Sequence, residues 1–174
     1  LDNVYIRGYP GTVINQSVAG QKGISLTSCT NILIENVNFA GPNTGGDTAN
    51  VAQTEYGIHI VSGTRVEIRH CDVTGFGYKG IQVDAAQCIV ADCVVTGTDV
   101  TVANSNVTGI TIFGGKSSIE RCWIDNYTNG ISSQSGTVNR IQDNEVNQVD
   151  PPTAINTAAY INAPYLILTG NHIY

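Results

Sequence analysis

The sequence contains no methionine, a single tryptophan and only eight lysine and arginine residues among 174. Without methionine, Leu1 is not a translational start, and no leader of charged and then apolar residues follows it. We therefore expect a fragment or a processed form of a longer chain. The net charge of -6 leaves no basic patch, which argues against nucleic acids and anionic membranes as partners. No apolar run is long enough to cross a membrane, and the length predicts one domain over residues 1–174.

Charged residues make up only 13% of the chain, whereas glycine, with 19 residues, is abundant, as are Val, Ile, Asn and Thr. This composition favours a turn-rich β protein over a helical bundle. The cysteines are odd in number, five in all, and their spacing fits neither a zinc CxxC pair nor a compact disulfide framework. We expect no disulfides, no metal site and no cofactor.

The dipeptide Gly-Ile recurs five times, beginning at residues 23, 57, 80, 109 and 130. Each copy opens an alternation of apolar and polar residues that is typical of a short strand. Two more short alternations follow in each repeat, so each unit contains three strands separated by tight turns. One unit cannot bury its own apolar side, and units must therefore stack with equivalent strands paired. The repeat predicts an all-β parallel β-helix of about six to seven coils.

Two stretches carry a resemblance to a known family: "LDNVYIRGYPGTVI" at the start of the chain and "SCTNILIENVNFAG" at residues 28–41. Both are similar to the opening coils of right-handed parallel β-helix proteins, which include pectate-lyase-like proteins, polysaccharide hydrolases and phage tailspikes. The resemblance covers nearly the whole chain. It is specific for the fold rather than for one activity, since this fold hosts many chemistries.

Three cysteines fall at the same inward position of successive coils: Cys71, Cys93 and Cys122. We interpret them as a ladder of buried thiols that fills small sites in the core, because free cysteine behaves as a small hydrophobic residue. Asn144 and Asn171 take the same position in the last two coils. Their amides are expected to hydrogen-bond the backbone of neighbouring turns.

Extra residues fall just before a Gly-Ile strand, in 40–56, 96–108 and 147–160. Long loops on a rigid scaffold are where binding and catalysis usually occur, and in enzymes of the resembled family such loops wall a groove. The outward residues of the Gly-Ile strands are therefore the first candidates for a site. Reading coil by coil, the two outward rows are Ser25, His59, Gln82, Thr111 and Ser132, then Thr27, Val61, Asp84, Phe113 and Gln134.

His59 and Asp84 lie on adjacent coils with an offset of two residues, so their Cα atoms are expected about 8 Å apart. With Glu55 from the neighbouring loop, they form the predicted catalytic set. Aromatic rings that can stack on a sugar, and polar groups that can bind its hydroxyls, surround them. The predicted substrate-binding residues are Gln82, Tyr56, Tyr78, Lys79, Phe113, Thr111 and Trp123. An ordinary solvated sheet face is the alternative interpretation.

Trp123 belongs to a different outward row, on the third strand of each coil rather than on the Gly-Ile strand. Beside Glu145 it could stack a sugar ring, or it could be an anchor in a subunit interface. That row consists of Asn38, Asp72, Val94, Trp123, Glu145 and His172.

The sequence favours a polysaccharide depolymerase of tailspike type, located outside the cell or on a virion, with a polysaccharide or glycan as partner. Hydrolysis needs two carboxyl groups, and the partner of Asp84 would come from Asp47, Glu55 or Asp99. Elimination needs cationic stabilisation and a base, and the face offers only Lys79 and His59. The alternative function is a non-catalytic, receptor-binding or structural segment of a trimeric spike.

Overall fold

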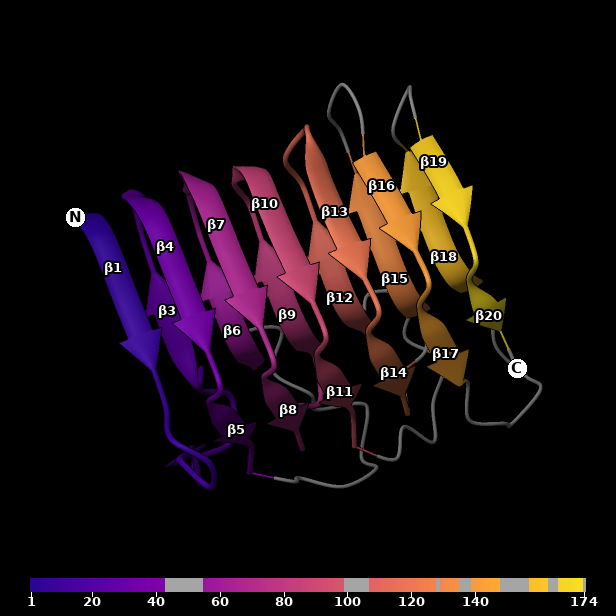
Figure 1. Cartoon of the computed structure of the whole chain (residues 1–174). Coiled ribbons are helices and arrows are strands. Elements are labelled where there is room, and N and C mark those ends of the chain that lie inside the picture. Colours follow the sequence, from indigo (N-terminus) through magenta and orange to yellow (C-terminus); the bar gives the residue numbers. More distant parts are fainter. Residues whose placement is uncertain are drawn as a thin grey trace.

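The computed structural model describes residues 1–42, 55–98, 107–127, 129–134, 139–147, 157–162 and 166–173. Its strands form three parallel sheets, each of which runs the length of the molecule (Figure 1). Sheet A has seven strands: β1 (Asp2–Arg7), β4 (Cys29–Glu35), β7 (Gly63–Arg69), β10 (Ala86–Ala91), β13 (Ser117–Glu120), β16 (Asn139–Gln142) and β19 (Leu166–Thr169).

The other two sheets are built in the same way. Sheet B contains β2 (Val13–Asn15), β5 (Asn38–Ala40), β8 (Asp72–Thr74), β11 (Val94–Thr96), β14 (Trp123–Asp125), β17 (Glu145–Asn147) and β20 (His172–Ile173). Sheet C contains β3 (Ile24–Leu26), β6 (Tyr56–Ile60), β9 (Lys79–Val83), β12 (Thr108–Ile112), β15 (Asn129–Gln134) and β18 (Thr157–Asn162).

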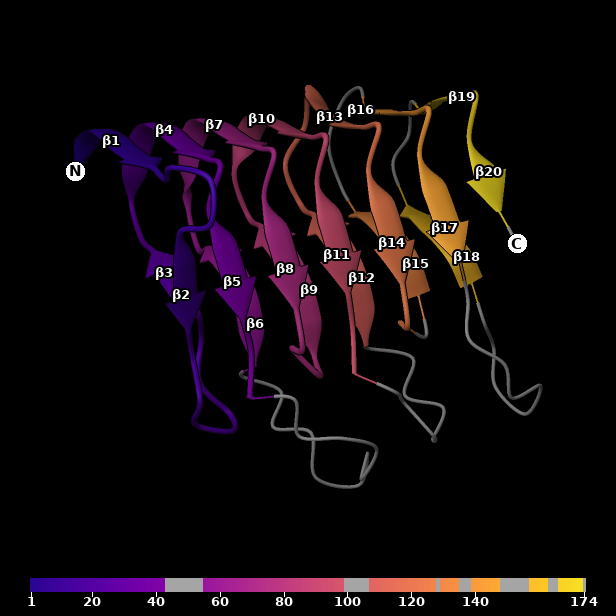
Figure 2. The ribbon, with the colours of Figure 1, turned by 60° about the horizontal axis from the view of Figure 1, so that its bottom comes forward.

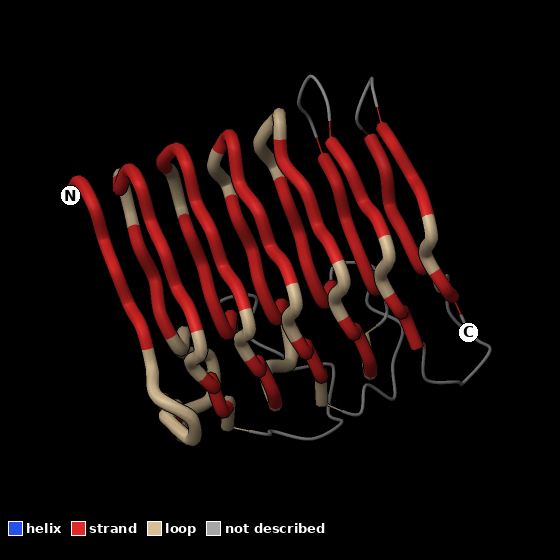
Figure 3. Tube along the Cα trace, viewed as in Figure 1, coloured by secondary structure: helices blue, strands red, loops and turns tan. Residues whose placement is uncertain are grey.

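The chain visits sheets C, A and B in turn, and each strand pairs in parallel with its equivalent one coil away (Figure 3). Ile58 of β6, for example, lies between Ile24 of β3 and Ile81 of β9. Sheets B and C pack against each other, with sheet A along one side (Figure 2). The predicted parallel β-helix with three strands per coil is thus confirmed.

The core is a set of rows in which equivalent inward side chains stack from coil to coil. Val66, Cys88 and Ile119 of sheet A, and Val73, Val95 and Ile124 of sheet B, are all buried. Period-two alternation produces these rows, because every second side chain of a strand points to the same face.

The predicted thiol ladder is present. Cys71, Cys93 and Cys122 are buried, and each thiol donates to the carbonyl oxygen two residues earlier and to a carbonyl of the preceding coil. All five cysteines are free. At the next coil, Asn144 Nδ2 donates to the Ile119 carbonyl and Asn144 Oδ1 accepts from the Cys122 amide, as expected. An amide thus continues the ladder by bonding the backbone of the adjacent coil.

The turn from sheet A to sheet B rests on one residue in the left-handed conformation, repeated in successive coils. Non-glycine residues occupy it, with φ between 48° and 56°. At one step of this stack Arg121 forms a bidentate ion pair with Asp92, which lowers the pKa of that carboxyl. The turn has the same length in each of these coils, so it fixes the alignment of sheet A on sheet B. Its residues are Asn36, His70, Asp92, Arg121 and Asp143.

One sequence expectation about a loop is wrong in part. The sequence predicts a long loop through residues 157–160, yet these residues open β18, which pairs with β15 in sheet C. This strand carries Ala158 and Ala159 where other coils have Gly-Ile, so the dipeptide did not mark it. Among the described residues there is no helix of the length and apolarity needed to span a membrane.

Candidate functional site

The outer face of sheet C carries the predicted row of polar residues in the predicted register. His59 pairs with Ser25 on one side and Gln82 on the other, and Gln82 pairs with Thr111. The register follows from the buried isoleucines of these strands, since a slip of one residue would turn them outward.

Five side chains form one continuous chain of hydrogen bonds over this face. Lys79 Nζ donates to Gln82 Oε1 at 2.7 Å, and Gln82 Nε2 lies 2.8 and 2.9 Å from the two carboxylate oxygens of Asp84. His59 Nε2 lies 3.3 Å from Asp84 Oδ2. On the far side of the ring, Lys22 Nζ lies 3.0 Å from His59 Nδ1. Asp84 is the only carboxylate among these five hydrogen-bonded side chains, and a lysine stands at each end of the series.

The two neighbours of His59 determine where its ring proton sits. An ammonium group has donors only, so Lys22 requires an unprotonated Nδ1 that accepts. Nε2 therefore carries the hydrogen and donates it to Asp84. Lys22 and Asp84 together hold the imidazole in a single tautomer and a single orientation.

Aromatic rings surround this hydrogen-bonded chain. The Tyr56 ring stacks on His59, with centroids 4.3 Å apart and planes at 15°, and Tyr78 meets Tyr56 edge-on at 5.4 Å. Lys79 Nζ lies 5.3 Å from the Tyr78 ring centroid and 5.5 Å from that of Phe113. Desolvation lowers the pKa of Lys79, opposed by Asp84, and raises the pKa values of both tyrosines.

The face is more enclosed than the sequence indicated. His59, Gln82, Thr111 and Lys79 are buried, whereas the Asp84 side chain keeps 27% of its surface exposed. The rings of Tyr56, Tyr78 and Phe113 are half-buried. The arrangement is a buried polar floor with a half-open rim, and Asp84 is the member of the hydrogen-bonded chain that presents a carboxylate to solvent.

Comparison with protein-family models gives a match to the model described as right handed beta helix region, over residues 2–158. The chain belongs to the right-handed β-helix family. This assigns the hand of the coil, and it confirms the resemblance seen in the opening coils. Comparisons with curated proteins and with solved structures found no significant match.

In this right-handed β-helix, Glu55 does not offer a free carboxylate beside Asp84. It is 1% exposed, and its oxygens accept from the backbone amides of Gly77 at 3.1 Å and Gly20 at 3.4 Å. A buried carboxylate that accepts hydrogen bonds from backbone amides in this way links the turns that supply those amides. Asp47 and Asp99, the other acids considered for the second carboxyl group, lie outside the described residues.

Trp123 also lies apart from the other predicted binding residues. It projects from β14 on the outer face of sheet B and is 39% exposed, paired with Val94 and Glu145. The expectation that it points outward is confirmed, but it belongs to a different face from His59 and Asp84. The remaining predicted binding residues all lie on or beside sheet C.

Lys22 was missed by the sequence interpretation, although the sequence contains a signal for it. It stands directly before the first Gly-Ile dipeptide, in the position that Tyr56 and Lys79 occupy in the next two coils. The outward rows were begun after the dipeptide, so this position was counted as loop. The residues that directly precede Gly-Ile thus form a third row of the site, beside the two rows predicted from the sequence.

Thr111 supplies one unusual feature of the floor. It is fully buried, and its hydroxyl has no hydrogen-bond partner among the described residues. A buried hydroxyl without a partner is costly, and a bound water or a ligand hydroxyl would satisfy it. The described residues contain no group of three or more His, Cys, Asp or Glu side chains arranged to hold a metal ion.

Proposed function

We propose that this β-helix binds a glycan over the outer face of sheet C and hydrolyses a glycosidic bond there, with Asp84 as the residue that exchanges the proton. The observation that carries the proposal is the hydrogen-bonded chain Lys22, His59, Asp84, Gln82 and Lys79, with its single, part-exposed carboxylate at the centre. The aromatic rim supports it, because sugar rings present apolar faces that stack on Tyr and Phe.

The chemistry assigned to Asp84 follows from its partners. Gln82 and His59 donate to its oxygens, which fixes the carboxylate and leaves it able to take a proton from an attacking water. The water hydroxyl adds to the anomeric carbon as the carbon–oxygen bond breaks, and Asp84 passes the proton taken from the water to the leaving oxygen. His59 orients the carboxylate directly, and Lys22 acts on it through His59.

Replacing Asp84 with Asn tests this function. Asn keeps the shape but cannot take up the proton, so we expect turnover to fall at least about 100-fold while glycan binding persists. The measurement is mass spectrometry of products from a panel of neutral and acidic polysaccharides, in which hydrolysis adds one water per cleaved bond. Asp72→Asn, on the exposed face of sheet B, is the matched control and should behave as wild type.

A second candidate function is glycan binding without cleavage, as in a receptor-binding or structural segment of a trimeric spike. It is favoured by the position of Glu55, whose carboxylate is engaged by backbone amides and is not free to act as a second acid beside Asp84. Glycan binding with no products from either wild type or Asp84→Asn would support this function and contradict hydrolysis. Unsaturated products would instead indicate elimination.

A further inference from the structure

The outer face of sheet A contains a long groove, remote in the fold from the sheet C site. Two hollows, of about 290 Å³ and about 340 Å³, lie along it and share Ile89. Their lining extends from Tyr5 on β1 to Ile167 on β19, so the groove crosses all seven strands of the sheet. At a strand spacing of about 4.8 Å its length is roughly 29 Å.

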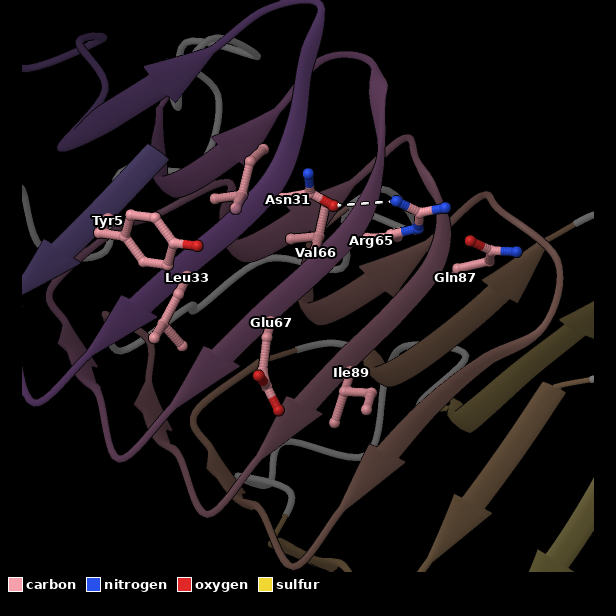
Figure 4. Close-up of a pocket in the computed structure, with 9 residues that line it drawn as sticks. Tyr5, Asn31, Leu33, Arg65, Val66, Glu67, Gln87 and Ile89 are labelled. Carbon is pink, nitrogen blue, oxygen red and sulfur yellow. Dashed lines mark hydrogen bonds between the residues drawn. The ribbon is translucent and has the colours of Figure 1, made fainter. Parts of the chain in front are cut away.

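The floor of the groove is one register row of sheet A. Exposed apolar side chains recur in it, with Tyr5 at 69%, Ile89 at 36% and Ile167 at 43% exposure. The close-up in Figure 4 shows the first part of this row, with Tyr5, Leu33, Glu67 and Ile89 on successive strands. The whole row is Tyr5, Leu33, Glu67, Ile89, Ser118, Arg140 and Ile167.

One wall of the groove is a row of long polar side chains that donate hydrogen bonds. Asn31, Arg65 and Gln87 lie in line across three neighbouring strands in Figure 4, and Arg65 Nη1 donates to Asn31 Oδ1 at 3.2 Å. Lys116 takes the same position in the next coil and lines the second hollow. All four have a left-handed backbone, with φ between 51° and 58°.

The charges on this side of the molecule are distributed unevenly. Of the eight Lys and Arg residues, only Lys22 and Lys79 belong to the sheet C site, and the other six lie in or beside sheet A. Three of these are paired with carboxylates: Arg7 with Glu35, Arg69 with Glu67, and Arg121 with Asp92 and Glu120. In the part of the chain that the structure describes, Arg65, Lys116 and Arg140 form no ion pair, and these three line the groove.

The acids that line the groove do not cancel this charge. Glu67 is paired with Arg69, whereas Arg121 is shared between Glu120 and Asp92. One negative charge therefore remains beside the three unpaired cations, and the net charge along the groove is still positive although the whole chain carries -6. Such a groove selects an extended anionic ligand over a neutral one. A polypeptide cannot add to this face as a further strand, because the strand backbones of sheet A already bond one another. Sugar hydroxyls, in contrast, match amide and guanidinium donors.

We propose that the outer face of sheet A is a second binding site, for a linear acidic polysaccharide that lies along the axis of the β-helix. Arg65, Lys116 and Arg140 bind the anionic groups, Asn31 and Gln87 bind hydroxyls, and Tyr5 stacks on a sugar ring at one end. The site is independent of the proposed chemistry at Asp84, since the two sites share no residue.

Isothermal titration calorimetry at low and moderate salt tests this proposal, with alginate and heparin oligosaccharides as acidic probes and dextran of matched length as the neutral probe. We expect both acidic probes to bind with salt-dependent affinity and dextran not to bind. The variant Arg65→Gln/Lys116→Gln should weaken binding at least about tenfold, because charged hydrogen bonds are lost. Gln suits the left-handed backbone there, as Gln87 already occupies the same row with φ 58°.

The charge-matched control is Arg7→Gln/Arg121→Gln, which removes two positive charges that are paired with carboxylates and do not line the groove, and it should leave affinity for the acidic probes nearly unchanged. An equal loss in both double variants would mean that affinity follows the net charge rather than the groove and would overturn the proposal, as would no binding of either acidic probe. Sedimentation velocity covers a third outcome: a dimer that dissociates only in Arg65→Gln/Lys116→Gln would identify a second copy of the chain as the occupant and also overturn it. Loss of hydrolysis in Asp84→Asn with alginate binding intact would separate the two sites.

Discussion

His59 lies between an ammonium group and a carboxylate, and this position restricts its chemistry. Both ring nitrogens are within hydrogen-bond reach of a charged neighbour, Lys22 on one side and Asp84 on the other. The Tyr56 ring covers one face of the imidazole at 4.3 Å. A histidine with both nitrogens engaged orients its neighbours more readily than it exchanges protons with a substrate, which fits the reactive role proposed for Asp84.

Removing the ammonium should release the imidazole. In Lys22→Met, Nδ1 loses its donor, so we expect the ring to lose its fixed Nε2–H tautomer. Two-bond ¹⁵N–¹H correlation spectra of His59 measure this directly, because protonated and unprotonated ring nitrogens differ widely in ¹⁵N shift. Lys22→Arg retains a donor and should keep the wild-type pattern. A spectrum of Lys22→Met identical to wild type would contradict the assigned role of Lys22.

The Gly-Ile dipeptide is explained at the scale of the strand. A Cβ atom on Gly57 would lie 2.2 Å from Val73 Cγ1, one on Gly80 would lie 2.2 Å from Val95 Cγ1, and one on Gly109 would lie 2.3 Å from Ile124 Cγ2. At the start of β6, β9 and β12, sheet C thus approaches sheet B so closely that no side chain fits. Glycine is needed for this contact between sheets, whereas isoleucine fills the core beside it.

Gly80→Ala should therefore destabilise the fold. The added methyl group would meet Val95 and also the Gly109 carbonyl oxygen at 2.7 Å, so strand β9 must shift away from both neighbours. Overpacking of this kind costs about 1–3 kcal/mol, measurable as a lower midpoint in urea unfolding. Thr96→Ala, on the outer face of β11, should change the free energy of unfolding by less than about 0.5 kcal/mol. Equal midpoints for Gly80→Ala and wild type would mean that the sheets have room to separate.

The fold was predictable from the sequence because it depends on local alternation repeated many times. The rows that contain His59, Gln82 and Thr111 follow from counting two residues along each strand, and the offset of Asp84 from His59 was correct for the same reason. The site was less predictable. The burial of Lys79 and the engagement of Glu55 by amides depend on how turns of adjacent coils pack, and alternation within one strand contains no information about that.

Several thiol and phenol groups among the described residues are buried on folding, and their pKa values shift as a result. Burial raises the pKa of the Cys88 thiol from 9.0 to about 11, and also raises that of Tyr127, while the Cys122 thiol raises the pKa of Cys93. The pKa values of three groups are lowered instead: Lys79 through desolvation, Cys71 through its hydrogen bond with Cys93, and Asp92 through its hydrogen bonds from Arg121. The protonated state of the buried thiols and phenols is therefore coupled to folding.

Alkaline pH should unfold the protein at lower denaturant concentration. Between pH 9 and pH 11 the unfolded chain releases a proton that native Cys88 keeps, so the free energy of unfolding falls as pH rises. For this thiol alone the full loss is about 3 kcal/mol. Urea titrations from pH 7 to pH 11 measure the slope. Cys88→Val, which copies Val66 at the paired position of the preceding coil, should lower the slope, and an unchanged slope would contradict the shift.

The constant corner between sheets A and B has a consequence for how such a chain grows. One left-handed residue forms this corner in coil after coil. A segment that runs from one strand of sheet C to the next is therefore a complete coil, and its strands can pair with the coil before it and the coil after it. Gene duplication of such a segment would lengthen the solenoid by one rung without redesign of its neighbours. Insertions between sheets B and C would decorate a single edge. The number of coils and the loops between sheets B and C can thus evolve independently, the first by duplication of whole coils and the second by insertions at one corner.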